Sequence, residues 1–341
     1  MRRVLVGIML LLVVAAAVAV AAGSLAWRRL QDPYKGYEGP ERFVVIAPGT
    51  GAAAIGRLLV DAGVIHDEFT FRATLWWSGR SRELQAGEYR FDRPFAASDV
   101  VERLARGDVH TRRITFPEGL TIHEMAGLYE SRGFGAAVRF VEAAANVSLI
   151  RELDEEAVDL EGYLFPETYA LPSETPASRL IAMMVERFRA TYTDEWRRST
   201  QEHGWTPRQV VTLASLVEKE TGRPEERAVI AAVYRNRLKL GMRLQADPTV
   251  IFAMRRGGTY TGNIRRADLA LDSPYNTYRH AGLPPGPIAA PGAASLEAAL
   301  MPAIVSYLYF VSRNDGSHVF ARTLADHNRN VQEFQVRYFR R

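Results

Sequence analysis

The sequence contains no cysteine. Disulfide bonds, zinc–thiolate sites and thiol nucleophiles are therefore excluded. No GxxxxGK[ST] or GxGxxG pattern and no HExxH motif occurs either, so the usual nucleotide-binding loops and the zinc-protease signature are missing. The 7 histidines, His318 and His327 among them, have no metal-ligand spacing. We expect an activity that needs no metal and no cofactor.

The body of the chain also lacks a net charge. Of the net charge of +4 on 341 residues, all comes from residues 1–30, which contain Arg2, Arg3, Arg28 and Arg29 and no acidic residue. The remainder has 39 basic and 39 acidic residues. It therefore has no global positive field that would attract a phosphate backbone, and we expect no nucleic-acid partner.

A long apolar run lies near the beginning of the chain. Val4–Trp27 contains no ionisable side chain, and about 20 apolar residues suffice for a membrane-spanning helix. Paired arginines bracket the run, and Trp27 has the place of an interfacial aromatic residue. We expect residues 1–30 to form a cytoplasmic end and one transmembrane helix (about 4–27), with the body extracytoplasmic. The alternative is a cleaved signal peptide with a site at Ala19–Ala21, although its apolar region is typically only ~7–15 residues.

Three similar patterns follow a short linker. Residues 31–41 are rich in Pro, Gly and charge and are expected to form that linker. Residues 43–64, 88–109 and 113–134 each read as a strand, a turn and a helix, with Ser98 a candidate N-cap of the second helix. Such units are typical of LysM-like carbohydrate-binding modules. They would equally suit an ordinary α+β packing unit.

Two segments allow both a binding and a packing interpretation. Trp76 and Trp77 could stack on sugars, or they could belong to the core. The segment Glu161–Pro172 places Glu161 and Glu167 among aromatic residues. It could form the wall of a groove or a packed loop.

The most informative helix begins at Thr206, with Thr206 as N-cap and Pro207 at the first helical position. Its next turns are apolar around most of the circumference, so the helix should be buried. It ends in Glu218-Lys219-Glu220. At least one of these carboxyl groups should therefore lie at the boundary of the interior, where burial raises a carboxyl pKa and suits a general acid.

The two glutamates should point in opposite directions. At about 100° per residue, Glu218 lies on the side of Ala214, whereas Glu220 points roughly 160° away. They cannot form a pair that shares one substrate atom. Alternatively, both are solvated acids at a helix end, or Glu220 pairs with Arg223 or Arg227.

Several blocks along the chain resemble one enzyme family. The stretch Val211–Thr221 resembles the signature of the YceG-like, or MltG-type, endolytic murein transglycosylases. The likeness continues in the family's order through four further blocks: Glu161–Tyr169, Val233–Phe252, Ser273–Gly292 and Tyr307–Asn328. It covers essentially the whole chain from about residue 40.

The resemblance implies a fold and a reaction. The fold would be α+β, with a LysM-like subdomain at 42–112 and a mixed α+β catalytic domain at 113–341 around the buried helix. The substrate would be the glycan strand of peptidoglycan, cut at the β-1,4 bond after N-acetylmuramic acid to leave a 1,6-anhydro end. Glu218 would be the catalytic acid and then base, and Glu220 would be a structural acid or one that acts through a neighbour.

The resemblance also indicates substrate contacts and partners. Candidates for substrate binding are Gln245, Asp247, Tyr275, Asn276 and Tyr278, although Ser273–Thr277 is also good turn chemistry. The protein would sit in the bacterial plasma membrane and end strand elongation beside penicillin-binding synthases. Competing hypotheses are a membrane-anchored glycan-binding scaffold and a muramidase that hydrolyses its substrate.

Overall fold

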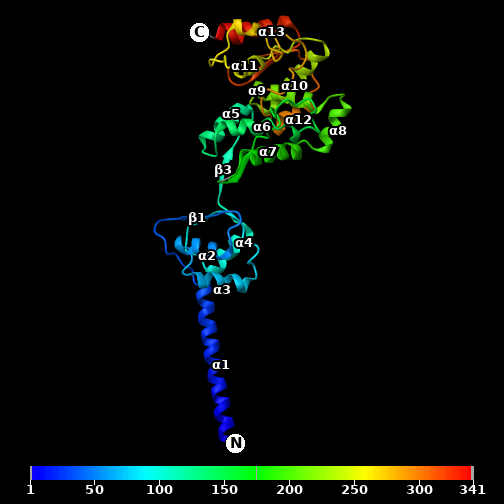
Figure 1. The fold of residues 1–341 in the computed structure, drawn as a ribbon. Helices are drawn as coiled ribbons and strands as arrows, with labels where there is room; N and C mark the ends of the chain where they lie inside the picture. Colours follow the sequence, from blue (N-terminus) through cyan, green and yellow to red (C-terminus); the bar gives the residue numbers. More distant parts are fainter. Residues whose placement is uncertain (1, 174, 339–341) are drawn as a thin grey trace. The chain divides into compact units, whose positions relative to one another are not determined.

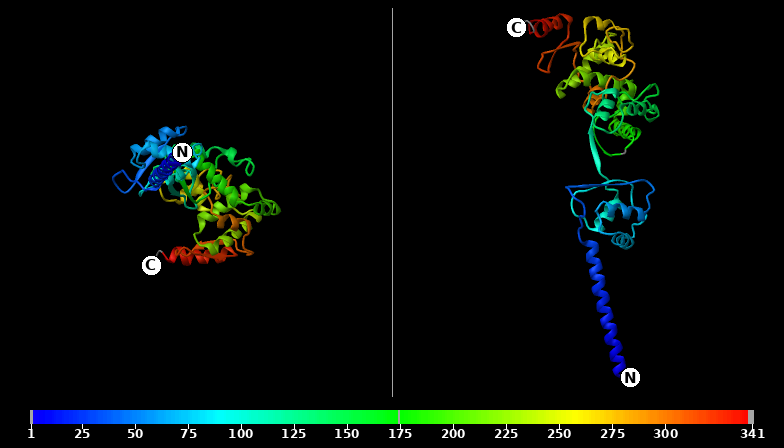
Figure 2. Two further views of the ribbon diagram at one scale, coloured as in Figure 1. Left: turned by 90° about the horizontal axis from the view of Figure 1, so that it is seen from below. Right: turned by 60° about the vertical axis from the view of Figure 1, so that its left-hand side comes forward.

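The computed structural model describes residues 2–173 and 175–338; the outermost ends of the predicted domain ranges lie outside them. Helices predominate and the sheets are small, so the prediction of an α+β fold is confirmed (Figure 1; Figure 2). The chain divides into two compact units. Unit 1 holds the residues up to Arg112 together with Ala170–Ser173, and unit 2 holds the rest.

Unit 1 alternates short strands with helices. Its elements are α1 (Arg2–Gln31), β1 (Arg42–Ile46), α2 (Ala52–Asp61), α3 (Glu68–Ser78), β2 (Gly87–Phe91) and α4 (Ala97–Arg106). β1 and β2 pair in antiparallel fashion, with Val44 opposite Tyr89. The inner residues of this sheet pack on the apolar faces of α2, α3 and α4, which bury Leu59, Phe71 and Leu104 completely.

The predicted strand–turn–helix pattern is confirmed, but one detail is wrong. α4 begins one residue before Ser98, and its N-cap is Ala96, which provides no side-chain hydrogen bond. The hydroxyl of Ser98 lies 3.3 Å from Oε1 of Gln31 instead. Over the residues that the structure describes, we found no helix combining the length and the apolar character that a membrane crossing requires.

Strands β3 (Thr111–Thr115) and β4 (Thr168–Pro172) form a second two-stranded sheet, and the division between the units falls within both strands. The other elements of unit 2 are α5 (Ile122–Ser131), α6 (Ala137–Ala144), η1 (Val147–Leu149), α7 (Ala177–Thr191), α8 (Asp194–Glu202), α9 (Pro207–Glu220), α10 (Pro224–Lys239), α11 (Asp247–Arg256), η2 (Arg266–Ala270), α12 (Ala293–Leu300), β5 (Tyr309–Ser312), β6 (His318–Ala321), α13 (Leu324–Val331) and η3 (Gln332–Arg337).

Helix α9 lies at the centre of unit 2. Thr206 and Gln209 form a capping box at its start, which confirms the predicted N-cap. Every residue from Val210 to Val217 is buried. The helices α8, α10, α11 and α12 pack around it. The helix that the sequence indicated as buried is therefore the core element on which unit 2 is built.

Candidate active site

Glu218 lies at the carboxyl end of α9 with only 7% of its side chain exposed. The backbone N–H of Gly292, at the start of α12, donates a hydrogen bond to its Oε2 at 3.0 Å. Nη2 of Arg227, from α10, lies 3.8 Å from its Oε1. An N–H donor and a guanidinium together stabilise a carboxylate that has given up its proton.

A second carboxyl group, which the sequence interpretation missed, faces the same arginine. Glu118 follows β3, and its Oε2 lies 3.9 Å from Nη2 of Arg227. Its side chain is 47% exposed, so it lies on the solvent side of Glu218. Burial and the neighbouring Glu218 raise the pKa of Glu118, whereas Arg227 lowers it. The signal available in the sequence was the place of Glu118 in Pro117-Glu118-Gly119, the turn between the predicted strand and helix of residues 113–134.

Hydrogen bonds hold the loop that carries Glu118 against Ala290, which precedes α12, and against Lys219 of α9. Gly119 donates its N–H to the carbonyl of Ala290 at 2.8 Å, and Ala290 donates back to Leu120 at 2.8 Å. Nζ of Lys219 donates to the carbonyl of Gly119 at 3.0 Å. Gly119 has φ +77°, a left-handed conformation that favours glycine. The loop is thus held from two sides.

Glu220 contacts different residues from Glu218. The hydroxyl of Tyr234 donates a hydrogen bond to Oε1 of Glu220 at 2.5 Å. Burial raises the pKa of Glu220, although this hydrogen bond opposes the rise. The alternative of a pair with Arg223 or Arg227 is wrong, because those guanidiniums contact other carboxylates.

Two of the five predicted substrate contacts, Asp247 and Tyr278, lie near Glu220, and a third, Gln245, donates its backbone N–H to Thr277 beside Tyr278 at 3.2 Å. The hydroxyl of Tyr278 donates to Oδ1 of Asp247 at 2.5 Å, and Asp247 in turn raises the pKa of the buried Glu220. Gln245 is exposed and has φ +50°, an uncommon conformation for a residue with a β-carbon. Such strain is frequent in binding sites. The exposed amide of Gln245 is therefore available to a ligand beside Asp247.

The other two predicted contacts are placed differently. Asn276 is completely buried, and its amide donates to the carbonyls of Leu269 and Leu271 at 3.0 and 2.8 Å. It supports its own loop and offers no free amide hydrogen to a ligand. The ring of Tyr275 packs on Phe252, with centroids 4.9 Å apart. The sequence could not distinguish exposed ligand contacts from buried structural residues, because all five side chains are polar or aromatic and of kinds that can bind sugars.

A pocket of about 660 Å³ lies between α5, α6 and α11. Its lining includes Ile122, Val141, Glu161 and Phe252. Glu161 accepts the N–H of Ile122 at 3.2 Å, and burial raises its pKa to about 8. A smaller pocket of about 150 Å³ shares Phe252 and reaches Lys219, the neighbour of Glu218. Glu161 therefore lines a cavity, whereas Tyr163 and Leu164 of the same segment are buried in the core, so the segment combines the two interpretations.

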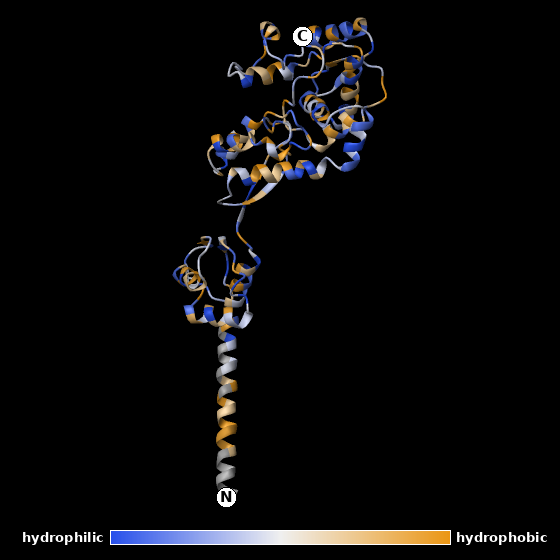
Figure 3. Cartoon of the chain, turned by 45° about the vertical axis from the view of Figure 1, so that its right-hand side comes forward, coloured by the Kyte–Doolittle hydropathy of each residue, from blue (hydrophilic) through white to orange (hydrophobic). Residues whose placement is uncertain are grey.

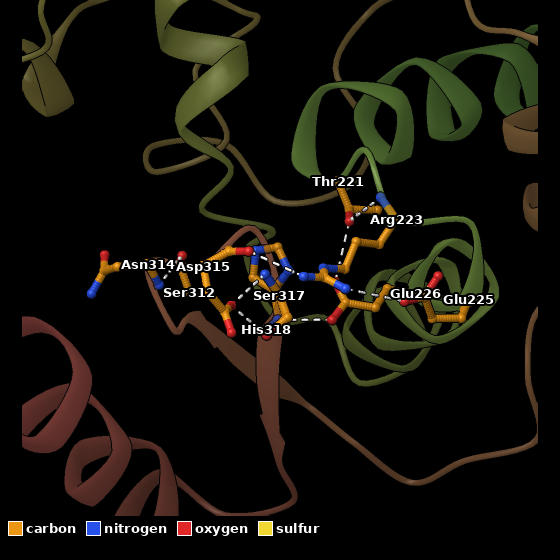
Figure 4. Close-up of polar contacts among 9 residues, drawn as sticks. All are labelled: Thr221, Arg223, Glu225, Glu226, Ser312, Asn314, Asp315, Ser317 and His318. Carbon is orange, nitrogen blue, oxygen red and sulfur yellow. Dashed lines mark hydrogen bonds and ion pairs between the residues drawn. The ribbon is translucent and has the colours of Figure 1, made fainter.

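The hairpin β5–β6 supports the junction of α9 and α10 (Figure 4). Glu226 accepts the backbone N–H of His318 at 2.8 Å, and its other oxygen lies 2.7 Å from Nδ1 of the same histidine. Thr221 donates its hydroxyl to Glu226 at 3.2 Å. Nη2 of Arg223 donates to the carbonyl of Asp315 at 3.1 Å. These contacts hold the turn that directly follows Glu220.

Within residues 2–173 and 175–338, no group of three or more histidine or acidic side chains could hold a metal ion.

The structure is thus an α+β protein whose buried core helix ends in a nearly enclosed carboxyl group beside an N–H donor and a guanidinium, an arrangement suited to acid–base chemistry. A model described as the YceG-like family matches residues 44–333. The chain belongs to the YceG-like family. That match spans both units and includes Glu118, Glu218, Arg227 and Gly292.

Named relatives and a solved structure agree with this family. A Bacillus subtilis (strain 168) protein named endolytic murein transglycosylase is 32% identical over 305 residues, which is 85% of this chain and 83% of the relative. A Streptococcus pneumoniae (serotype 2, strain D39) protein of the same name is 30% identical over 322 residues; the match covers 85% of this chain but 58% of that relative. A crystal structure of a yceG-like protein from Listeria monocytogenes is similar with a TM-score of 0.59 and 29% identity, covering 85% of this chain and 98% of that one.

Proposed function

We propose that this protein is an endolytic murein transglycosylase, a lyase that cuts the β-1,4 bond after N-acetylmuramic acid within a glycan strand and leaves a 1,6-anhydro end. The observation that carries the proposal is Glu218, a nearly enclosed carboxyl group with an N–H donor and a guanidinium beside it. The names of the relatives support the substrate and the reaction.

One carboxyl group can perform both proton transfers. Glu218 donates its proton to the glycosidic oxygen as the bond to C1 breaks, and the released sugar leaves with that proton. The resulting carboxylate is stabilised by Arg227 and by the N–H of Gly292. It then takes the proton of the C6 hydroxyl while that oxygen bonds to C1. The proton balance closes without water, and Glu218 is ready for another cycle.

The neighbouring surfaces would position the strand. The exposed Gln245 lies beside the Asp247–Tyr278 pair and can hydrogen-bond hydroxyl or N-acetyl groups. The pocket that reaches Lys219 is lined by Phe252 and by Pro248, the neighbour of Asp247 in the chain. A strand bound along these residues would reach Lys219, next to Glu218 at the end of α9.

The domain organisation and the location belong to the same proposal. Residues 42–112 form the LysM-like subdomain, and residues 113–341 form the catalytic domain. The run Val4–Trp27 anchors the chain in the bacterial plasma membrane with the catalytic body outside the cytoplasm, as its length and lack of ionisable side chains favour. An enzyme anchored there meets nascent strands as they emerge and would end their elongation beside penicillin-binding synthases.

Glu118 favours a second candidate function, a hydrolytic muramidase. Hydrolases that cleave glycosidic bonds ordinarily use two carboxyl groups, one of which activates water or attacks C1. Glu118 and Glu218 both approach Arg227, so a second carboxyl group is at hand. The two functions differ in their products, because hydrolysis leaves a reducing sugar whereas the lyase leaves an anhydro sugar.

The deciding experiment is digestion of purified peptidoglycan by the full chain, with mass spectrometry of the new ends. The lyase predicts anhydro ends throughout the time course and none from the Glu218→Gln variant. Reducing ends made by the wild-type protein and lost in Glu118→Gln would establish the muramidase. Binding of strands with no new ends of either kind would instead indicate a glycan-binding scaffold.

A further inference from the structure

Helix α3 exposes three large aromatic side chains on its outer face. Phe69 and Trp76 are each 80% exposed, and Trp77 is 66% exposed. Arg72 is exposed between them. Positions 69, 72 and 76 follow helical spacing and share one side of the helix, while the opposite side buries Phe71 and Leu75. We call Phe69, Arg72, Trp76 and Trp77 the aromatic face of α3.

The aromatic face is connected to the end of the apolar helix α1. The rings of Trp27 and Trp77 meet edge to face, with centroids 5.4 Å apart. Trp27 and Trp77 also line a pocket of about 200 Å³ between α1, α3 and α4. Figure 3 shows α3 lying across the end of α1, whose described middle section is strongly hydrophobic. The aromatic face therefore begins where the apolar segment ends.

Exposed aromatic side chains in such a cluster are costly in water. Each large aromatic side chain offers 150–250 Å² of mainly apolar surface, and contiguous exposed patches mark interaction sites. Tryptophan is favoured at the level of lipid headgroups, because its ring is apolar and its N–H is polar. Phe and Trp on one helix face, with arginine among them, is the composition of helices that lie in a membrane interface.

We propose that the aromatic face of α3 inserts into the interfacial layer of the membrane, so that α3 lies on the bilayer where α1 leaves it. This inference rests on the membrane anchor proposed above. If Val4–Trp27 spans the bilayer, Trp27 lies at its surface, and the ring contact holds Trp77 at the same depth. Arg72 and Arg28 are then placed to contact anionic phosphate groups of the lipids.

The shape of the surface favours lipid over glycan. Sugar-binding tryptophans usually line concave sites with convergent polar groups that fix the hydroxyls. Phe69, Arg72 and Trp76 lie on the convex outside of the helix, where a bilayer can cover them. Only Trp77 of the aromatic face also borders the small pocket beside α1. If α3 inserts in this way, it holds the LysM-like subdomain at a fixed position on the membrane surface.

The lack of cysteine makes a direct test possible. Single cysteines replace Arg72 on the aromatic face and, as the matched control, Val45 on β1, which is 57% exposed in the same unit. Each full-length variant is labelled with an environment-sensitive fluorophore. It is then reconstituted into vesicles of phosphatidylethanolamine and phosphatidylglycerol with and without lipid-attached shallow quenchers. We expect a blue shift and quenching for the label at position 72, and neither for the label at position 45.

The outcomes separate this inference from the anchor. If the protein floats with the vesicles and resists carbonate extraction while the label at position 72 remains as accessible to water as the control, the inference is overturned and the anchor stands. If the protein does not float, both are overturned. If purified peptidoglycan, rather than lipid, shields the label, and Trp76→Ser with Trp77→Ser abolishes that shielding, the face binds glycan and the lipid assignment is wrong.

Discussion

Glu118 and Glu218 face one guanidinium group: Nη2 of Arg227 lies 3.9 Å from a carboxyl oxygen of the first and 3.8 Å from one of the second. The two carboxylates repel each other, while the guanidinium beside them attracts both. The raised pKa of Glu118 has this repulsion among its causes, after burial. Glu118 therefore responds to the charge of Glu218, and both carboxyl groups depend on Arg227.

Replacing Glu218 by glutamine should abolish turnover without unfolding α9. The amide keeps the size of the side chain and can still accept the N–H of Gly292, but it cannot deliver a proton. General acid–base catalysis contributes about 10²- to 10⁴-fold, and both transfers use this group, so we expect a loss near the upper value. The rate of appearance of anhydro ends measures the loss, and an unchanged melting temperature is the control. If the Glu218→Gln variant forms anhydro ends at nearly the wild-type rate, Glu218 is not the catalytic acid.

Glu118→Gln should reduce the lyase rate far less than Glu218→Gln does. Glu118 has no proton transfer in the lyase mechanism and contributes only its charge beside Arg227. The measurement is the initial rate of anhydro-end formation by the two single variants at equal protein concentration. Equal, complete loss in both would mean that the two carboxyl groups act together, as they do in a hydrolase.

Gly292→Ala should lower activity by displacing the carboxylate of Glu118. A β-carbon on Gly292 would occupy the place of the Glu118 carboxylate, whereas φ of −77° is readily adopted by alanine. The backbone N–H that serves Glu218 remains. We expect the substitution to lower activity in the wild-type background and to have little further effect in Glu118→Ala. A double-mutant cycle measures this coupling. If the effects of the two substitutions are additive, Gly292→Ala does not lower activity through the Glu118 side chain.

Tyr234→Phe should destabilise the protein, whereas the Glu220→Gln variant should retain most of the wild-type rate of anhydro-end formation. Removal of the buried Tyr234 hydroxyl leaves Oε1 of Glu220 without its donor, at an expected cost of about 1–3 kcal/mol in the free energy of unfolding. Glutamine at position 220 can still accept that hydrogen bond. Urea unfolding and anhydro-end formation are measured on both variants. An inactive but stable Glu220→Gln variant would show that Glu220, rather than Glu218, performs the proton transfers.

Glu161 should make stability depend on pH. Burial raises its pKa from 4.5 to about 8, so the folded protein keeps this proton where the unfolded chain has lost it. The stabilisation is complete below pH 4.5 and is lost as pH rises towards 8. Relative to Glu161→Gln, which mimics the protonated acid, the wild-type free energy of unfolding should fall by roughly 1.4 kcal/mol per pH unit within this interval. Parallel pH profiles for the two proteins would show that Glu161 has an ordinary pKa.

Local patterns in the sequence determined the core helix of unit 2. Thr206, Pro207 and the apolar residues that follow are sufficient to predict where α9 begins and that it is buried, because capping and helical periodicity depend only on neighbours in the chain. The same periodicity predicts that Glu218 and Glu220 point in different directions, and the two side chains have different partners. The alternation of strands and helices in residues 43–134 was predictable for the same reason.

Only the tertiary structure decided which residues surround Glu218. Glu118 and Gly292 lie far from α9 in the sequence, and no spacing rule brings a turn after β3 and the start of α12 to one carboxyl group. Burial also separated residues that look alike in a sequence: Asn276 is enclosed, while Trp76, of a type often found in cores, is exposed. The physical reason is that hydrogen bonding and burial depend on distance in space, which the packing of whole elements sets.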